Sequence, residues 1–116
     1  DVTKELISFF AAQISKLHQL KVNDIIIDVG FGFGKTIEHN YQLLKDLALF
    51  KNLDAPILAG ISRKSMLYKP LEITPQLALN ATTSANTIAL LNGANILRVH
   101  DVKEAMEAIK IVEQLN

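Results

Sequence analysis

The sequence of 116 residues lacks cysteine altogether. This absence excludes disulfide bonds, zinc sites made of thiolates and a cysteine nucleophile, and it favours a cytoplasmic protein. An excess of either charge is also lacking, since 12 Lys and Arg residues balance 12 Asp and Glu residues. We therefore expect no binding to nucleic acid, and a charged ligand would have to be held by a local cluster. Long apolar runs and a visible signal peptide are absent too, so no membrane association is expected.

Apolar side chains are plentiful by contrast and make up 49% of the residues. This content suffices for one compact domain with a sizeable core. No linker, strong repeat or low-complexity tract divides the chain, so residues 1–116 are predicted to form a single domain or a piece of one. The chain opens at Asp1 without Met and enters a helical pattern almost at once, from which we expect a piece of a longer protein.

Helix signals occur in four stretches, namely 2–20, 36–50, 74–92 and 101 onward. The last three begin at residues that favour N-caps, which are Thr36, Thr74 and Asp101. A glycine at the C′ position follows the third stretch, and the fourth fits the capping-box pattern with a Glu three residues after its cap. These signals predict four helices.

Three short apolar runs lie between the predicted helices, near 25–28, 57–61 and 96–100. Each is typical of a strand that is buried on both faces, so the order αβαβαβα predicts an α/β fold with three parallel strands and right-handed crossovers. Two architectures remain open at this point. One is a small open sheet of the flavodoxin or Rossmann kind, and the other is a series of units from a (β/α)₈ barrel, which needs about 250 residues.

A glycine-rich loop, "DVGFGFGKT", runs from Asp28 to Thr36. It is one residue too short for a phosphate-binding P-loop, because only three residues separate Gly30 from Gly34 where the pattern needs four. The dinucleotide pattern G-x-G-x-x-G fails as well, since the loop reads G-x-G-x-G. The loop therefore does not predict nucleotide binding.

The same loop places a carboxylate beside aromatic rings. Asp28 ends the first predicted strand, and Phe31 and Phe33 alternate with the glycines that follow. An acceptor next to a ring suits a flat heterocycle with several N–H donors. The alternative is that Asp28 caps the following turn while the two Phe rings fill the core.

Polar side chains follow all three predicted strands. They are Asp28 after the first, Ser62, Arg63 and Lys64 after the second, and Arg98 and His100 at the end of the third. Because carboxyl ends of parallel strands meet at one edge, these groups predict one site, and its cations predict an anion pocket. In the alternative interpretation, Arg98 pairs with Asp28 as a structural bridge and His100 is a core histidine.

Other polar residues give weaker signals. His18 and His39 lie in predicted helices without the spacing of metal ligands, so we expect both at the surface. Lys35 follows the glycine loop near a helix start, a place that would also suit an anion. Asp101 follows "ILRVH" and is predicted to be a helix cap.

Three segments together resemble a known family. "DVGFGFGKTIEHN", "PILAGISRKSML" and "ILRVHDVKEAMEAIKIVE" are similar, in order and spacing, to the last third of dihydropteroate synthase. The resemblance covers nearly the whole chain. It departs at Val29, where the family usually has Pro, and over residues 68–81, to which no functional residue is transferred.

The resemblance implies the C-terminal part of a (β/α)₈ TIM barrel, with helices five to eight and strands six to eight. It implies an enzyme of folate synthesis that joins hydroxymethyl-dihydropterin pyrophosphate to para-aminobenzoate, releases pyrophosphate and is a target of sulfonamides. A magnesium ligand is expected in the absent N-terminal part and none in this chain. Negligible turnover by this chain alone is expected, and a homodimer or higher assembly is implied.

Site roles also follow from the resemblance. The implied pterin-binding residues are Asp28, Phe33, Gly60 and Lys64. Those implied on the pyrophosphate and para-aminobenzoate side are Ser62, Arg63, Arg98 and His100, and the catalytic set is Lys64, Arg98 and His100. Two other classes of protein stay open, which are a free-standing pterin- or phosphate-binding module and a structural piece whose polar strand ends form internal bridges.

Overall fold

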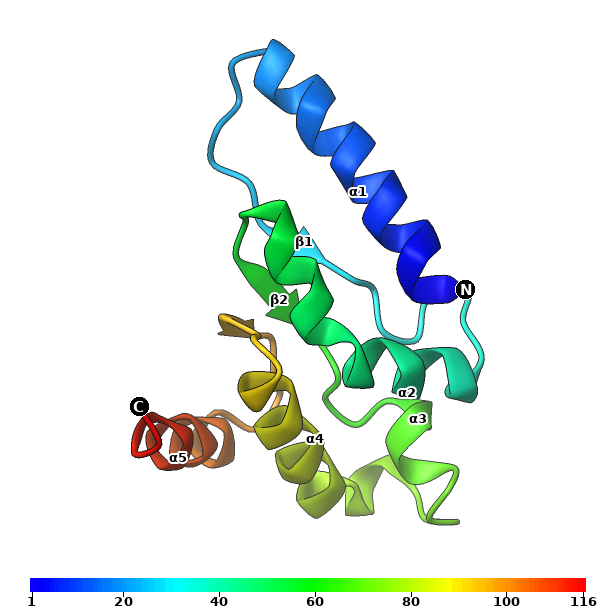
Figure 1. The fold of residues 1–116 in the computed structure, drawn as a ribbon. Helices are drawn as coiled ribbons and strands as arrows, with labels where there is room; N and C mark the ends of the chain where they lie inside the picture. Colours follow the sequence, from blue (N-terminus) through cyan, green and yellow to red (C-terminus); the bar gives the residue numbers. More distant parts are fainter.

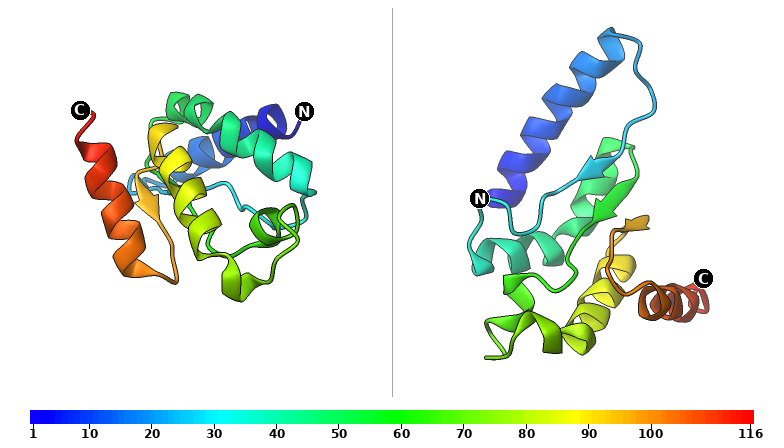
Figure 2. Two further views of the ribbon diagram at one scale, coloured as in Figure 1. Left: turned by 90° about the horizontal axis from the view of Figure 1, so that it is seen from below. Right: turned by 180° about the vertical axis from the view of Figure 1, so that it is seen from behind.

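Helices and strands alternate in the computed structural model, which describes residues 1–116 (Figure 1). The α-helices are α1 (Val2–Gln19), α2 (Ile37–Lys45), α3 (Ser65–Tyr68), α4 (Leu79–Leu91) and α5 (Val102–Glu113). The 3₁₀ helices are η1 (Leu47–Leu53) and η2 (Pro75–Leu77), and the strands are β1 (Ile27–Asp28), β2 (Ile57–Ala59) and β3 (Ile96–Leu97). The two termini lie at opposite ends of the molecule, with α5 beside α4 and far from α1 (Figure 2). No helix is both long and apolar enough to cross a membrane.

The three strands form one parallel sheet in the order β1-β2-β3. Ile27 lies opposite Ile57 on the neighbouring strand, and Ala59 lies opposite Leu97. Parallel strands joined by helical crossovers confirm the α/β class predicted from the sequence. The strands are shorter than predicted, since pairing covers 27–28, 57–59 and 96–97 only.

The prediction that the strands are buried on both faces is wrong. Ile27, Ile57 and Ala59 point to one face, where at most 2% of each residue is exposed. Ile26 and Ile96 belong to the other face and are 56% and 36% exposed. Side chains alternate along a strand, so the helices cover one face and leave the other open. The expected (β/α)₈ barrel accounts for this open face, because the remaining strands of such a barrel supply the side chains that cover it.

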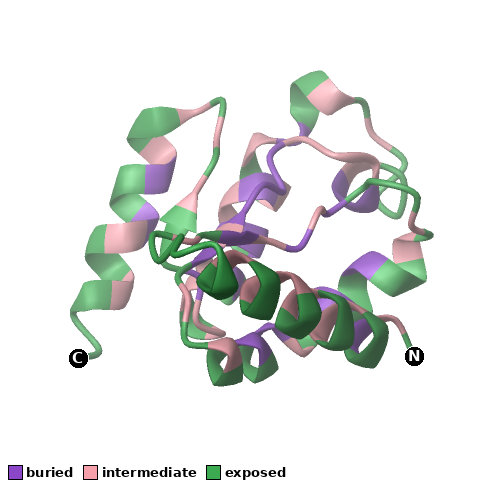
Figure 3. Cartoon of the chain, turned by 90° about the horizontal axis from the view of Figure 1, so that it is seen from above, coloured by how far each residue is buried: buried purple, intermediate pink, exposed green.

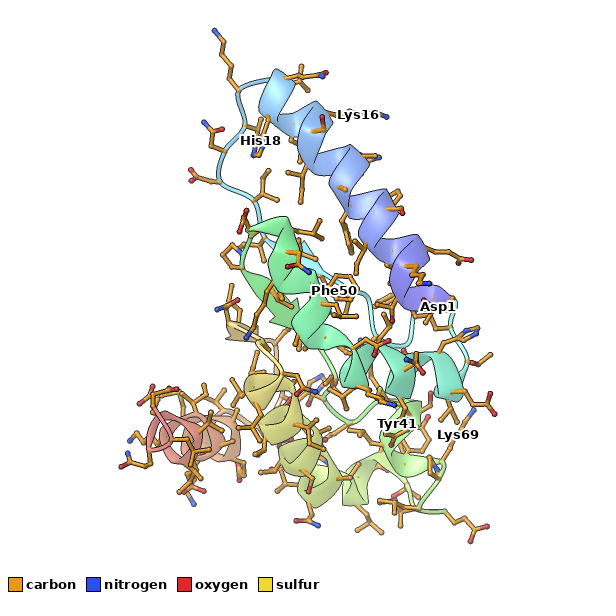
Figure 4. All side chains as sticks on the ribbon, viewed as in Figure 1. Asp1, Lys16, His18, Tyr41, Phe50 and Lys69 are labelled. Atoms are coloured by element: carbon orange, nitrogen blue, oxygen red, sulfur yellow. The ribbon has the colours of Figure 1, made fainter.

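The core fills the space between the covered sheet face and the helices, as the buried residues at the centre of Figure 3 show. Phe31 and Phe50 are its largest fully buried side chains. The Phe50 ring, labelled in Figure 4, lies 6.2 Å from the Phe10 ring of α1 in an edge-to-face arrangement. The Tyr41 hydroxyl donates a hydrogen bond to the Met66 carbonyl at 2.6 Å and ties α2 to α3. This core fixes the covered face and therefore the positions of the strand ends.

Two predicted helices are interrupted. The stretch 36–50 is helical to Lys45 and continues as 3₁₀ helix η1, and the stretch 74–92 divides into η2 and α4. The Thr36 N-cap is confirmed, because its Oγ1 accepts a hydrogen bond from the His39 amide at 3.1 Å. Thr74 precedes η2 but its side chain makes no capping bond. Gly93 takes the left-handed conformation after α4, with φ of +103°, as its predicted C′ position requires.

Candidate functional site at the carboxyl ends of the strands

The glycine loop follows β1, and its conformation is stabilised by hydrogen bonds to Asp28 and to a residue of α2. Gly30 and Gly32 have φ of +71° and +85°, which residues with a Cβ rarely adopt. Asp28 Oδ1 accepts a hydrogen bond from the Gly30 amide at 2.9 Å, so Asp28 does cap the turn. The Gly32 amide donates to Oδ1 of Asn40, a residue of α2 that is 2% exposed. Two hydrogen bonds therefore fix the loop, one to the end of its own strand and one to α2.

The two Phe side chains of the loop have different environments. Phe31 is fully buried in the core, whereas Phe33 is 69% exposed. The Lys64 ammonium lies 4.9 Å from the centre of the Phe33 ring, which is a cation–π contact. Core filling thus holds for Phe31, and Phe33 remains free to stack on a ligand.

Arg98 crosses the end of the sheet above Gly60. Asp28 is the last residue of β1, and Gly60 and Arg98 directly follow β2 and β3 on the same open face. Arg98 Nη1 donates a hydrogen bond to Asp28 Oδ2 at 2.9 Å. A Cβ at position 60 would meet the guanidinium, with Cζ at 2.9 Å. The absence of a side chain at Gly60 therefore leaves the passage through which Arg98, after β3, reaches Asp28 on β1. Arg98 and Asp28 thus form the structural bridge of the alternative interpretation, and both side chains stay accessible, at 53% and 36% exposure.

Replacing Gly60 by Ala should displace Arg98 from Asp28 with little loss of stability. The φ of Gly60 lies outside the left-handed region, so Ala fits the backbone, but its methyl group would occupy the guanidinium's place. An exposed ion pair contributes only about 0–1 kcal/mol to folding. The free energy of unfolding, measured in urea, should therefore change by no more than about 1 kcal/mol. The NMR signal of Arg98 Nε–H should move. An unchanged Arg98 signal would contradict the assigned passage.

Ser62 and His100 meet at the same edge. His100 Nδ1 lies 2.9 Å from Ser62 Oγ, and the His100 amide donates to the same oxygen at 3.3 Å. Ser62 is 6% exposed, whereas His100 is exposed, so His100 is not a core histidine. These two residues line a cavity of about 110 Å³ together with Gly60, Lys64 and Arg98.

Lys64 joins this cavity to a second one of about 290 Å³, lined also by Phe33, Arg63 and Tyr68. Its ammonium donates a hydrogen bond to the Phe31 carbonyl. Burial first, and then the nearby Arg98 cation, lower the pKa of Lys64. A charged Lys64 therefore lowers the free energy of unfolding, and this effect is complete at pH values below the lowered pKa. It disappears as pH rises past the ordinary lysine pKa of about 10.4, where the amine is neutral in both states. A ligand acceptor would relieve the cost.

Arg63 is bound within the protein. Its guanidinium forms two hydrogen bonds to Asp101, from Nε to Oδ2 and from Nη2 to Oδ1, both at 3.0 Å. Asp101 does precede α5, but its side chain makes no capping bond, so the predicted capping box is wrong. The carboxylate pairs with a cation 38 residues away instead. The hydrogen bonds from Arg63 hold the pKa of Asp101 below its ordinary value.

The stability contributed by Asp101 should depend on acid pH. A carboxyl with a lowered folded pKa stabilises the protein above its unfolded pKa of about 3.9, and the contribution is lost as pH falls through the folded value. Asp101→Asn should therefore lower the urea midpoint at neutral pH, and the difference should shrink below about pH 4. Asp46, whose pKa is lowered by hydrogen bonds from Gln42 and Thr3, is common to both proteins and cancels.

Glu107→Gln is the matched control for this measurement, because its ion pair with Lys103 is exposed and 3.9 Å long. A difference between Asp101→Asn and the parent that persists unchanged down to pH 2 would contradict the assigned role of the Asp101 charge.

Two residues that hold the site are not among the site residues predicted from the sequence. Asn40 anchors the glycine loop, and Thr82, 2% exposed on α4, accepts a hydrogen bond from the Arg63 amide at 3.0 Å. The only sign of these roles in the sequence is that Asn40 and Thr82 are polar residues on the buried side of a helix. Lys35 donates to the carbonyls of Gly30 and Phe33, and His18 and His39 are exposed as expected. No group of three or more His, Asp or Glu side chains could hold a metal ion.

A larger hollow, of about 580 Å³, lies between the start of α1 and the glycine loop. Of the site residues predicted from the sequence, only Phe33 lines it. The smaller cavities bring together Lys64, Arg98, His100 and Ser62, and they therefore have the convergent donors that a binding site needs.

A parallel sheet with helices on one face and polar side chains at the carboxyl ends of its strands is the arrangement of a (β/α)₈ barrel, whereas an open, doubly wound sheet carries helices on both faces. The chain forms a part of such a barrel. The family model described as "Pterin binding enzyme" matches residues 1–100, and the chain belongs to that family.

Known proteins agree with this assignment. Dihydropteroate synthase of Escherichia coli K12 is 43% identical over 115 residues, which cover 97% of this chain and 41% of that protein. The Yersinia pestis enzyme with a pterine-sulfa conjugate superposes with a TM-score of 0.95 at 39% identity and covers 99% of this chain and 46% of its own. The Thermus thermophilus enzyme in complex with 4-aminobenzoate gives 0.93 at 35% identity, covering 100% and 46%. The chain thus spans less than half the length of these relatives.

Proposed function

We propose that this chain is the part of a dihydropteroate synthase that binds the pterin and the pyrophosphate. The observation that carries the proposal is the row formed by Asp28, Gly60 and Arg98 on the open sheet face. It sets a carboxylate acceptor and a guanidinium donor side by side, with Lys64 and the exposed Phe33 ring adjacent. Pterin and 4-aminobenzoate ligands on the relatives support the substrate class.

The pterin is proposed to take the place of Arg98 beside Asp28. Its amino and ring N–H groups would donate to the carboxylate, and Lys64 would donate to its carbonyl oxygen. The Phe33 ring is exposed, so a face of it is available to stack on the heterocycle. Asp28 keeps its hydrogen bond from the Gly30 amide meanwhile, so the carboxylate stays fixed.

The pyrophosphate is proposed to bind Arg98, His100 and Ser62, which line the small cavity. The C–O bond between the pterin methylene and the pyrophosphate breaks, and both electrons leave with the oxygen. The lone pair of the aryl amine then forms the C–N bond, and the amine loses a proton. Fixed donors that face the leaving oxygens assist the departure electrostatically. The position of Arg63 near the para-aminobenzoate side stays a prediction.

Magnesium is implied by the family, but the residues of this chain do not form a site for it. No cluster of three acidic or His side chains is present, and the carboxylates of Asp28 and Asp101 are each held by an arginine. We therefore assign no step to the metal, and its ligands are proposed to come from residues outside this chain.

A homodimer is a further part of the proposal, together with a cytoplasmic location. Apolar side chains on α4 and α5 are exposed, which are Ile88, Leu91, Val102, Met106 and Ile111. An apolar surface of this kind favours association. Light scattering on the purified chain should show a dimer or a larger species, and a monomer at all concentrations would count against it.

A chimera tests the function directly. The 115 residues of the Escherichia coli enzyme that align with this chain would be replaced by the chain itself, and dihydropteroate formation would be measured. We expect activity in the chimera and negligible turnover by the chain alone. Calorimetric titration of the chain with the pterin pyrophosphate then shows whether three strands suffice for binding. A folded but inactive chimera, with an active parent enzyme beside it, would refute the proposed function.

A further inference from the structure

We propose that Arg63 is a positioning residue, which together with Asp101 forms a clasp that holds the phosphate-side groups Ser62 and His100 in register. This inference rests on the proposed function and deepens it. The clasp joins the turn after β2 to the junction between β3 and α5, which are the two segments that carry the donors of the small cavity. It differs from the expectation that Arg63 itself faces the ligand.

The side chain of Arg63 has little capacity left for a ligand. Besides the two hydrogen bonds to Asp101, Nη1 donates to the carbonyls of Pro75 and Gln76 at 2.8 and 2.9 Å. Four of its five N–H groups are thus engaged within the protein. A bidentate guanidinium–carboxylate pair fixes both distance and orientation, which a single lysine contact does not. Arg63 therefore connects its own turn to residues 75–76 and to Asp101. Its guanidinium is used for these contacts and not for an external anion.

The backbone at Arg63 is equally constrained. Its φ of +53° lies in the left-handed region, which is uncommon for a residue with a Cβ. The buried Thr82 hydroxyl accepts its amide proton at 3.0 Å, and the Lys64 amide closes the turn onto the Ile61 carbonyl at 3.1 Å. Such a conformation persists only where surrounding contacts hold it. Since Ser62 and Lys64 flank Arg63, the clasp also sets the direction of both side chains.

On the other side, Asp101 directly follows His100. The His100 amide and ring nitrogen both lie within hydrogen-bond distance of Ser62 Oγ, at 3.3 and 2.9 Å. The Ser62–His100 contact and the clasp therefore bridge the same two segments in parallel. Only about a quarter of the Arg63 side chain and a fifth of Asp101 are exposed, so solvent screens the clasp less than the other ion pairs of the chain. Loss of the clasp should release His100 from Ser62. The lowered pKa of Asp101 agrees with a carboxylate that stays charged in this contact.

The test uses the chimera described above and three variants, Arg63→Lys, Asp101→Asn and the double variant. We expect each single variant to lower kcat about tenfold or more, with a much smaller change in KM, because misplaced donors lose contact with the leaving group. The double variant should lose no more than either single variant, since both remove one contact. Glu107→Gln, which breaks the exposed pair on α5, is the control and should leave kcat unchanged.

A second arm uses the 116-residue chain and needs no activity. The backbone amide signals of Ser62 and His100 should move in both Arg63→Lys and Asp101→Asn and stay in place in Glu107→Gln. Unmoved signals would overturn the clasp. Losses that multiply in the double variant, or a loss confined to Arg63→Lys, would also overturn it and indicate direct contact of Arg63 with substrate. An inactive parent chimera counts against the proposed function alone, and the NMR arm then decides the clasp.

Discussion

Replacing Asp28 by Asn should weaken binding of the pterin pyrophosphate to the active chimera by about 10- to 100-fold. A hydrogen bond to a charged group contributes about 1.5–3 kcal/mol, and each 1.4 kcal/mol corresponds to a factor of ten. Asn keeps the oxygen that accepts the Gly30 amide, so the loop should hold its shape. It replaces the oxygen that faces Arg98 and the proposed pterin donors with an N–H group. Titration calorimetry measures the change directly.

Asp24→Asn provides the control for this prediction. Asp24 is exposed and lies four residues earlier in the segment that precedes β1, so its substitution removes the same charge away from the sheet edge. Equal losses in the two variants would show that net charge, and not the Asp28 carboxylate, determines affinity. An unchanged affinity in Asp28→Asn would remove Asp28 from the proposed pterin site.

Phe31→Ala should destabilise the chain by about 3–5 kcal/mol, which is the range for truncating a buried Phe. Phe31 is 0% exposed and belongs to the core cluster, so the substitution leaves a cavity in the core. Because domains of this size are stable by only about 5–15 kcal/mol, much of the variant should be unfolded at moderate urea concentrations. Urea unfolding followed by circular dichroism gives the value.

Phe33→Ala is the matched variant two residues along the same loop. Phe33 is 69% exposed, so its truncation should change the free energy of unfolding by about 0.5 kcal/mol or less. It should instead weaken pterin binding, because the ring proposed to stack on the ligand is gone. The opposite pattern, with Phe33→Ala unfolding the chain and Phe31→Ala harmless, would contradict the division of the loop into a core side and a ligand side.

Features that depend on neighbouring residues could be predicted from the sequence. The first helix, expected over 2–20, is found over Val2–Gln19. Thr36 caps α2 by accepting a hydrogen bond from the amide three residues later in the chain. Gly93 has the backbone conformation that its place after a helix requires. Interactions of this kind lie within one helical turn, so the local sequence determines them.

Features that depend on distant partners could not be predicted to the same extent. The strands are shorter than their apolar runs because pairing requires a neighbour, and Ile25 and Ile26 have none. Helix α3 has four residues, too few for a period of 3.6 to be visible. Asp101 occupies a cap position, but its carboxylate pairs with Arg63, 38 residues earlier.

The candidate site divides in the same way. Parallel strands bring their carboxyl ends together, so the gathering of Ser62, Lys64, Arg98 and His100 around one cavity follows from the topology. The residues that hold this arrangement, Asn40 and Thr82, lie on helices that carry no motif. Their role depends on which helix face meets the loops, and a single sequence leaves that orientation open.

Because Arg98 passes over Gly60 to Asp28, the guanidinium and the carboxylate of the proposed site are paired with each other. A ligand that brings only N–H donors must compete with Arg98 for Asp28, and a ligand that brings only an anion must compete with Asp28 for Arg98. Whichever fragment binds first releases the group that the second fragment needs, so the two should bind cooperatively. An exposed pair of this kind is worth about 1 kcal/mol at most, which sets the coupling at about fivefold. The Arg98–Asp28 pair, which contributes little to folding, thereby competes with both ligands and couples the binding of one to the binding of the other.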